Sequence, residues 1–214
     1  MKEKNQLFGR ERICASFMNN KIREKTLNIG AGEVLWIENG IFLGDKEFIS
    51  SDITKENLGE HNLAKTKMII NAEKMPFADG EISQVIILDV LEHIKKDEVA
   101  VKEISRVMKS RGFLVVCVPN DTVLSYLNPV RYVQHERHYS IKRITSLLER
   151  NRFKIEKLFA GGGIFELINL YTHFLIKYTT GKIINPSFFN KLRDKEYKKH
   201  NPSGNEIAIR AIKI

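Results

Sequence analysis

The chain has 214 residues, of which 43% are hydrophobic and 29% charged, and this composition is that of one folded domain and excludes a disordered or low-complexity chain. Its two cysteines, Cys14 and Cys117, stand far apart and belong to no metal-ligand motif, so we expect neither a disulfide framework nor a bound metal. No apolar signal segment follows the N-terminal charges, and no stretch approaches the ~20 apolar residues of a membrane span. We therefore expect a single cytoplasmic domain over residues 1–214.

The formal net charge of +9 is unevenly distributed along the chain. Residues 1–25 carry seven lysines and arginines against three acids, residues 26–120 carry eleven against fifteen, and residues 121–214 carry seventeen against eight. The central segment is therefore acidic and both ends are basic, which makes the ends available for an anionic partner. The alternative interpretation is an ordinary solvated basic surface.

Short apolar runs recur from the start of the acidic segment to the end of the chain. Strands are predicted over residues 26–29, 47–52, 68–70, 83–88, 113–118, 153–160 and 206–214. The central runs are rich in β-branched residues without polar alternation, which is typical of strands covered on both faces, as in a parallel sheet. Apolar residues at helical spacing predict helices over residues 97–109 and 141–150. This alternation indicates an α/β fold.

Several residues predict where helices begin and end. Gly112 follows the first of these helices and Asn151 follows the second, and both types favour a left-handed helix terminus, whereas Ser140 suits the N-cap of the second helix. The stretch from Gly32 to Glu47 is short and contains two glycines, so a full helix there is left open. Residues 1–24 are expected to form an N-terminal helical segment.

A turn of small residues, Gly30-Ala31-Gly32, directly follows the first predicted strand. Such a turn lets the backbone approach a ligand closely and offers amide groups to it. The second strand ends at Asp52, twenty residues after Gly32, close to the ~20-residue spacing at which an acid in a Rossmann-like fold accepts ribose hydroxyls. Glycine turns are common and an acid at a strand end is often only a cap, but together they predict a nucleoside-type ligand.

Three further motifs follow in order, and together they carry a family resemblance. They are Asn71-Ala72-Glu73-Lys74-Met75-Pro76-Phe77-Ala78-Asp79-Gly80, Leu88-Asp89-Val90-Leu91-Glu92-His93-Ile94 and Val107-Met108-Lys109-Ser110-Arg111-Gly112-Phe113-Leu114. Their order and spacing closely resemble the class I S-adenosylmethionine-dependent methyltransferases, in the branch that acts on small molecules. The resemblance covers about residues 25–160.

The resemblance implies a Rossmann-like, doubly wound and mostly parallel seven-stranded sheet whose last strand is antiparallel. It also implies a helical insert between strands six and seven. Residues 25–160 would then form the cofactor-binding core, residues 161–205 the substrate, lid or interface insert, and residues 206–214 the last strand. S-adenosylmethionine would be the methyl donor and S-adenosylhomocysteine the product.

Residue by residue, the resemblance implies a donor site. Its members would be Gly30, Ala31 and Gly32 beside the methionine part, Asn28 where an acid usually orients the glycine turn, Asp52 on the ribose, Asn71, Ala72 and Glu73 beside the adenine, and Asp89 and Val90 at the methyl-bearing end. Asn28 and Asn71 stand where acids are common in the family, and each amide keeps hydrogen-bonding capacity.

Methyl transfer from a sulfonium is an in-line displacement with a neutral leaving group, so the protein mainly has to align the two reactants. A hydroxyl acceptor would also need a base. The candidate side chains for proton transfer are His93, His135, His138 and Tyr139. The alternative for each is a surface or helix-capping role.

Residues 164–177 predict a helix whose polar side chains fall on one narrow stripe, so that most of its surface should be buried. Packing on the domain, a homodimer contact, and an apolar substrate or membrane surface are the competing destinations. Residues 186–200 that follow are rich in lysine and arginine with interspersed aromatics, which suits anionic headgroups, a phosphate-bearing acceptor or RNA. Peripheral membrane contact through residues 164–199 is therefore one prediction.

The predicted function is methyl transfer to a small-molecule acceptor or to one linked to a lipid or carbohydrate. A nucleic-acid methyltransferase, including one acting on RNA, is the first alternative, and it is disfavoured because residues 89–92 lack the Asn/Asp-Pro-Pro-aromatic motif used on base amines. A non-catalytic nucleoside- or dinucleotide-binding protein is the second. A nicotinamide-dependent reductase is disfavoured because the chain lacks a GxGxxG turn.

Overall fold

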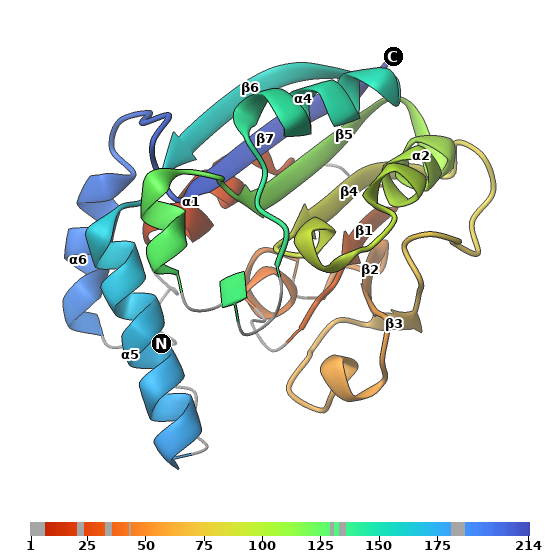
Figure 1. The fold of residues 1–214 in the computed structure, drawn as a ribbon. Helices are drawn as coiled ribbons and strands as arrows, with labels where there is room; N and C mark the ends of the chain where they lie inside the picture. Colours follow the sequence, from red (N-terminus) through yellow and green to blue (C-terminus); the bar gives the residue numbers. More distant parts are fainter. Residues whose placement is uncertain are drawn as a thin grey trace.

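The computed structural model describes residues 7–20, 24–32, 36–42, 44–128, 131–132, 136–180 and 187–214. Its centre is a seven-stranded sheet in the order β3-β2-β1-β4-β5-β7-β6 (Figure 1). The strands are β1 Thr26–Ile29, β2 Phe48–Asp52, β3 Thr66–Ile69, β4 Ile82–Leu88, β5 Met108–Pro119, β6 Phe153–Gly161 and β7 Glu206–Lys213. Strands β1 to β5 pair in parallel, and β7 is antiparallel to both of its neighbours. The predicted fold class is confirmed.

Helices and short helical turns connect the strands. The helices are α1 Gly9–Phe17, α2 Asp97–Val107, α4 Ile141–Arg150, α5 Ile164–Thr180 and α6 Ser187–Glu196, and the turns are η1 Ile37–Ile41, η2 Glu56–Leu58, η3 Leu91–His93 and η4 Val123–Leu127. Helices α2 and α4 lie on one face of the sheet and α1 on the other, while α5 and α6 form the insert between β6 and β7 (Figure 1). As predicted, the Ser140 hydroxyl caps α4 by accepting the N–H of Arg143 at 3.2 Å.

Both faces of the sheet are buried, which explains the continuous apolar runs. Along β4, Val85 and Ile87 pack in the core that contains α2 and α4, whereas Ile86 packs in a second core with α1 and η1. β5 follows the same rule, with Val116 in the first core and Cys117 in the second. Because successive side chains point to opposite faces, strands buried on both sides need apolar residues at consecutive positions.

The predictions of left-handed termini at Gly112 and Asn151 are wrong. Helix α2 ends at Val107 and runs directly into β5, and the positive φ of 64° belongs to Arg111. Gly112 is needed for another reason, because a Cβ there would lie 2.9 Å from the carbonyl oxygens of Lys109 and Ser83.

The chain also turns one residue later than predicted after α4. The backbone φ of Asn151 is −100°, and the left-handed residue is Arg152, with φ of 66°. The side-chain amide of Asn151 instead donates a hydrogen bond to the Leu147 carbonyl at 2.9 Å. Between Gly32 and Glu47, the part of the chain that the structure describes holds only the short turn η1.

On helix α5 the polar residues Glu166 and Asn169 face inward, and the apolar residues on the opposite side are exposed. That apolar side does not pack on the domain, so the homodimer and the apolar substrate or membrane surface stay predictions for it. The reason for the inward position of Glu166 is a buried ion pair with the neighbouring helix: Nε and Nη2 of Arg193 on α6 each donate to a carboxylate oxygen of Glu166 at 2.9 Å. Leu167 is buried as an apolar anchor.

The outward face of α5 is consequently apolar. Its exposed members are Ile164, Ile168, Tyr171 and Leu175, at spacings of three and four residues that form one stripe. The Tyr171 hydroxyl donates to the Leu127 carbonyl of η4, so the stripe continues onto this turn, where Val123, Tyr126 and Leu127 are exposed as well. We call these seven residues the apolar surface. None of the helices in the described residues is long and apolar enough to span a membrane.

Candidate functional site

The strand order places a crevice at one edge of the sheet. β1 is flanked by β2 on one side and β4 on the other, so the connections leave β1 and β4 in opposite directions. In open α/β sheets, ligands bind at the carboxyl ends of the strands at such a reversal. The turn Gly30–Gly32 and the side chains of Asp52 and Asp89 follow β1, β2 and β4 at this edge.

Hydrogen bonds hold the glycine turn against the end of β2. The N–H groups of Gly30 and Ala31 donate to the Ser51 carbonyl at 2.8 and 2.9 Å, and the N–H of Gly32 donates to Oδ2 of Asp52 at 3.1 Å. Oδ1 of Asp52 accepts from the Ile53 N–H and the Asn57 amide. The two sequence signals are therefore parts of one bonded unit.

Two cavities open beside this unit. The larger one, of about 540 Å³, is lined by all of the predicted ribose, adenine and methyl-end residues, together with Gly30 and Gly32. The smaller one, of about 210 Å³, is lined by Asn28 and the turn Gly30–Gly32, with Asp89 shared between the two cavities. All ten predicted donor residues thus surround a continuous region of the sheet edge, and their individual contacts with a donor stay predictions.

Asn28 is linked to an acid that the sequence analysis did not single out. Its amide donates to the buried carboxylate of Glu38 on η1, which also accepts the Ser50 hydroxyl at 3.3 Å. Burial raises the pKa of Glu38. An amide on β1 and an acid behind it therefore take the place of the acid that is common on this strand in the family.

The backbone at Asp89 is left-handed, with φ of 55°, which is uncommon for a residue other than glycine. Its N–H donates to the Cys117 carbonyl at 3.0 Å, so β5 holds the turn in place. The carboxylate is thereby set at the junction of the two cavities, and strained residues of this kind cluster at functional sites.

Comparison with known proteins gives a match over the same part of the chain. Residues 27–116 match the family model described as a methyltransferase domain. A probable S-adenosylmethionine-dependent methyltransferase of Mycolicibacterium smegmatis is 30% identical over 105 residues, which is 45% of this chain and 39% of that protein. Over this segment the chain is similar to a methyltransferase domain, as the motifs implied. S-adenosylmethionine is the cofactor of this family, as the resemblance implied.

Solved structures share the fold of the methyltransferase domain at low identity. A Thermotoga maritima protein described as a SAM-dependent methyltransferase, possible histamine N-methyltransferase, has a TM-score of 0.60 and 16% identity, covering 89% of this chain and 82% of that one. Geranyl diphosphate C-methyltransferase of Streptomyces coelicolor gives 0.60 and 12%, covering 95% and 76%. A [4+2]-cyclase gives 0.64 and 14%, covering 94% and 80%. Because this last protein is a cyclase, the fold alone does not define the reaction.

The four candidates for proton transfer have different positions in the structure. His93 on η3 lines the larger cavity, and burial lowers its pKa. His138 is buried, its Nδ1 lies 3.3 Å from the Asn120 carbonyl oxygen, and its Nε2 has no hydrogen-bond partner. Tyr139 is fully buried, lines neither cavity, and donates to Asp97 at 2.9 Å. His135 lies outside the described residues.

Arg10 of α1, Glu206 of β7 and Glu136 also lie at this edge, and the sequence analysis did not select them. Nη1 of Arg10 lies 2.8 Å from Oδ2 of Asp89 and 3.6 Å from Oε1 of Glu206. Burial raises the pKa of Glu206 to about 8 and that of Glu136 to about 7. The sequence signal that could have selected Glu136 was its place between His135 and His138. No sequence signal indicates that Arg10 on the first helix meets Glu206 on the last strand.

Asp89, Cys117 and Glu206 bring three possible metal ligands within 4.8 Å of one another. The guanidinium of Arg10 is already paired with both carboxylates, so this group has a cation of its own. A hydrogen bond with Cys14 raises the pKa of the Cys117 thiol, which disfavours the thiolate that a metal needs. The expectation of no metal stays a prediction.

Replacement of Asp52 by alanine should weaken S-adenosylhomocysteine binding about 10- to 100-fold while the protein stays folded. The variant loses the predicted acceptor for the ribose hydroxyls and also the bond that holds the Gly32 N–H. Titration calorimetry measures the affinity, with Asp45→Ala, in a turn away from the cavities, as the matched control. An unchanged affinity in folded Asp52→Ala would remove Asp52 from the donor site.

The raised pKa of Glu136 should make stability depend on pH. In the unfolded chain this carboxyl loses its proton near pH 4.5, whereas in the folded protein it keeps the proton until about pH 7. The free energy of unfolding therefore falls as pH rises through this window, by about 3 kcal/mol at most. Urea unfolding should show that Glu136→Gln gains stability relative to the unmodified protein between pH 5 and pH 8. The exposed control Glu149→Gln should show no such gain, and equal behaviour of the two variants would contradict the prediction.

Proposed function

We propose that the protein transfers a methyl group from S-adenosylmethionine to a small-molecule acceptor or to one linked to a lipid or carbohydrate. The observation that carries the proposal is the bonded unit of the glycine turn and Asp52 beside two cavities that share Gly30, Gly32 and Asp89 as lining residues. S-adenosylmethionine consists of a nucleoside and an amino-acid chain joined at one sulfur, so it needs two adjoining cavities. The larger cavity is lined by Asp52, the acid suited to the ribose hydroxyls.

The donor supplies an activated methyl group, and the residues of this chain hold it and align the acceptor. Asp52 would accept the ribose hydroxyls, and the segment Asn71–Glu73 would border the adenine. The smaller cavity, lined by the glycine turn and Arg10, would hold the charged methionine end. Asp89 and His93 lie on the side of the larger cavity where the acceptor would approach.

A thermal-shift panel tests donor identity. S-adenosylmethionine, S-adenosylhomocysteine, NADH, NADPH and ATP are each added to the protein. A ligand at 100 times its dissociation constant stabilises the fold by about 2.7 kcal/mol, so the first two should raise the melting temperature and the other three should not. Stabilisation by NADH or NADPH alone would contradict the proposal.

A nucleic-acid acceptor and a non-catalytic nucleoside-binding role are the alternatives. Release of S-adenosylhomocysteine upon addition of bulk RNA, with methyl-labelled donor incorporated into the RNA, would support the first. Donor binding with no transfer to RNA, small metabolites or lipid extracts would support the second. The basic charge of the C-terminal segment does not separate these alternatives, because any anionic acceptor suits it.

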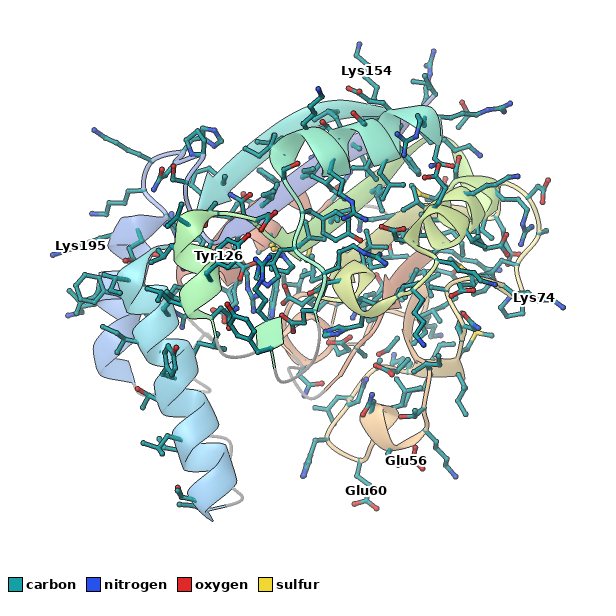
Figure 2. All side chains as sticks on the ribbon, in the orientation of Figure 1. Glu56, Glu60, Lys74, Tyr126, Lys154 and Lys195 are labelled. Carbon is teal, nitrogen blue, oxygen red and sulfur yellow. The ribbon has the colours of Figure 1, made fainter. Side chains whose placement is uncertain are left out.

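We also propose that the apolar surface contacts an anionic membrane. Exposed lysines on and after α6 lie in the same insert: Lys191, Lys195, Lys198 and Lys199. Figure 2 shows Lys195 pointing away from the rest of the molecule and Tyr126 on η4 beside α5. Apolar side chains enter the interface, and each nearby cation adds about 1 kcal/mol. Arg193 is excluded from this set because it is buried against Glu166.

Replacing these four lysines with glutamine should abolish sedimentation with vesicles. The unmodified protein should pellet at low salt with vesicles of phosphatidylglycerol and phosphatidylcholine, and less so at high salt. Donor affinity should be the same in both proteins. If the unmodified protein stays in the supernatant, the membrane proposal is wrong, and sedimentation equilibrium would then test whether the apolar surface forms a homodimer.

A further inference from the structure

Four carboxyl groups gather beside the donor cavities, and they belong to three separate parts of the chain. Asp89 and Glu92 follow β4, Glu136 precedes α4, and Glu206 begins β7. They are close enough that the charges of Asp89, Glu136 and Glu206 all raise the pKa of Glu92, in addition to the effect of burial. The edge of the sheet is therefore strongly acidic, although the protein as a whole is basic.

One guanidinium among the described residues offsets part of this charge. Arg10 pairs with Asp89 at 2.8 Å and with Glu206 at 3.6 Å. In the part of the chain that the structure describes, neither Glu92 nor Glu136 forms an ion pair with a lysine or arginine, and Oε2 of Glu92 is buried without any hydrogen bond. Burial of an uncompensated carboxylate is costly, which is why the pKa of Glu136 is raised to about 7. A bound cation would restore the charged form.

A second observation concerns the two imidazoles beside Glu136. Nε2 of His138 is 3.9 Å from Oε2 of Glu136, in a side chain that is only 1% exposed, and it has no hydrogen-bond partner. Nε2 of His93 is 3.6 Å from the other carboxylate oxygen. Both distances exceed a normal hydrogen bond, and burial lowers the pKa of both imidazoles, so neither supplies a charge. Glu136 thus lies between two imidazoles and forms a hydrogen bond with neither of them.

Solvent reaches this group from the donor side. The side chain of His93 is 40% exposed and that of Asp89 36%, and both line the larger cavity. Glu136 itself is 10% exposed. Glu136 lines neither cavity, so a ligand in the larger cavity would reach it past His93, whose Nε2 lies 3.6 Å from its carboxylate.

We infer that the methyl acceptor carries a basic nitrogen and that Glu136 binds this nitrogen next to the donor cavity. The inference rests on the proposed function and narrows its acceptor class. An anionic acceptor would oppose the ionisation of these carboxyl groups still further, and a neutral alcohol would do nothing to favour it. An ammonium group favours the charged form of Glu136 and donates hydrogen bonds to its carboxylate.

The same arrangement suits the reaction if the bound nitrogen is the nucleophile. The protonated amine loses one proton to the Glu136 carboxylate, and the freed lone pair forms the new N–C bond to the methyl carbon. The C–S bond breaks at the same time, its electron pair stays on sulfur, and a neutral thioether leaves. The product is a methylated ammonium ion, whose positive charge the carboxyl cluster stabilises.

Matched pairs of amines and alcohols test the inference. The probes are benzylamine with benzyl alcohol, cyclohexylamine with cyclohexanol, and ethanolamine with ethylene glycol, each incubated with S-adenosylmethionine. Mass spectrometry should find methylated product from amines and none from the alcohols. Glu136→Gln should raise the KM for a reacting amine at least about tenfold, Glu136→Asp should recover part of the loss, and Glu149→Gln should be unchanged.

The outcomes separate the inference from the proposed function. If S-adenosylhomocysteine binds but alcohols react as well as amines, or if no amine reacts, the inference is overturned and the donor assignment stands. Equal KM values for Glu136→Gln and Glu149→Gln also overturn it. If S-adenosylhomocysteine does not bind the unmodified protein, the proposed function fails first.

Discussion

Replacement of Gly30 by alanine should abolish measurable S-adenosylhomocysteine binding and lower the free energy of unfolding by about 2 to 4 kcal/mol. The added Cβ would lie 2.2 Å from Cγ2 of Val90, a stiff β-branched side chain at the predicted methyl-bearing end. The backbone φ of 74° adds strain for any residue with a Cβ. Relief of the clash requires movement of the turn or of Val90, and both line the larger cavity.

Gly40→Ala is the matched control for this substitution. Gly40 is exposed in η1, and a Cβ there would meet nothing within 4 Å. Urea unfolding and titration calorimetry should show this variant close to the unmodified protein. If Gly30→Ala binds S-adenosylhomocysteine as tightly as Gly40→Ala does, the glycine turn does not contact the donor.

Replacement of Arg193 by methionine should lower the free energy of unfolding of the insert by about 3 to 5 kcal/mol. The guanidinium makes two bonds of 2.9 Å to Glu166, and its side chain is 5% exposed while that of Glu166 is 14% exposed. Removing it leaves the carboxylate buried without a cation. Hydrogen exchange of α5 and α6 should show the loss, because the effect begins in these two helices.

The double variant Glu166→Met/Arg193→Met distinguishes the ion pair from general packing. Removing both charges relieves the uncompensated carboxylate, so the double variant should be more stable than Arg193→Met alone. Lys195→Met, on the exposed side of α6, should change stability by less than about 0.5 kcal/mol. A double variant that is no more stable than the single one would show that the ion pair does not hold α5.

The sheet and its donor edge were predictable because their signals are local. Strand β4 is a continuous apolar run because both of its faces are buried, and Asp89 marks its end. The spacing from Gly32 to Asp52 corresponds to one crossover between neighbouring parallel strands, and the structure joins the two residues by a hydrogen bond. Each of these patterns lies within a few tens of residues.

The acidic cluster was not predictable in the same way, because its members meet only after folding. Arg10 and Glu206 are separated by almost the whole chain, and the antiparallel β7 between β5 and β6 brings Glu206 to the edge where α1 lies. The orientation of α5 depends likewise on Arg193 of the next helix. A helical wheel contains no information about a charged partner elsewhere, so it could not predict that Glu166 and Asn169 lie on the inward side of α5.

A crystal structure of the protein with S-adenosylhomocysteine tests the central claim most directly, since it locates the donor site without knowledge of the acceptor. The ribose hydroxyls should lie within hydrogen-bond distance of the Asp52 carboxylate, with the adenine beside Ala72 and the methionine end against the turn Gly30–Gly32. The sulfur should lie next to Asp89, on the side that faces Glu136. A ligand bound elsewhere, or one in the larger cavity with its ribose turned away from Asp52, would contradict the donor site described above.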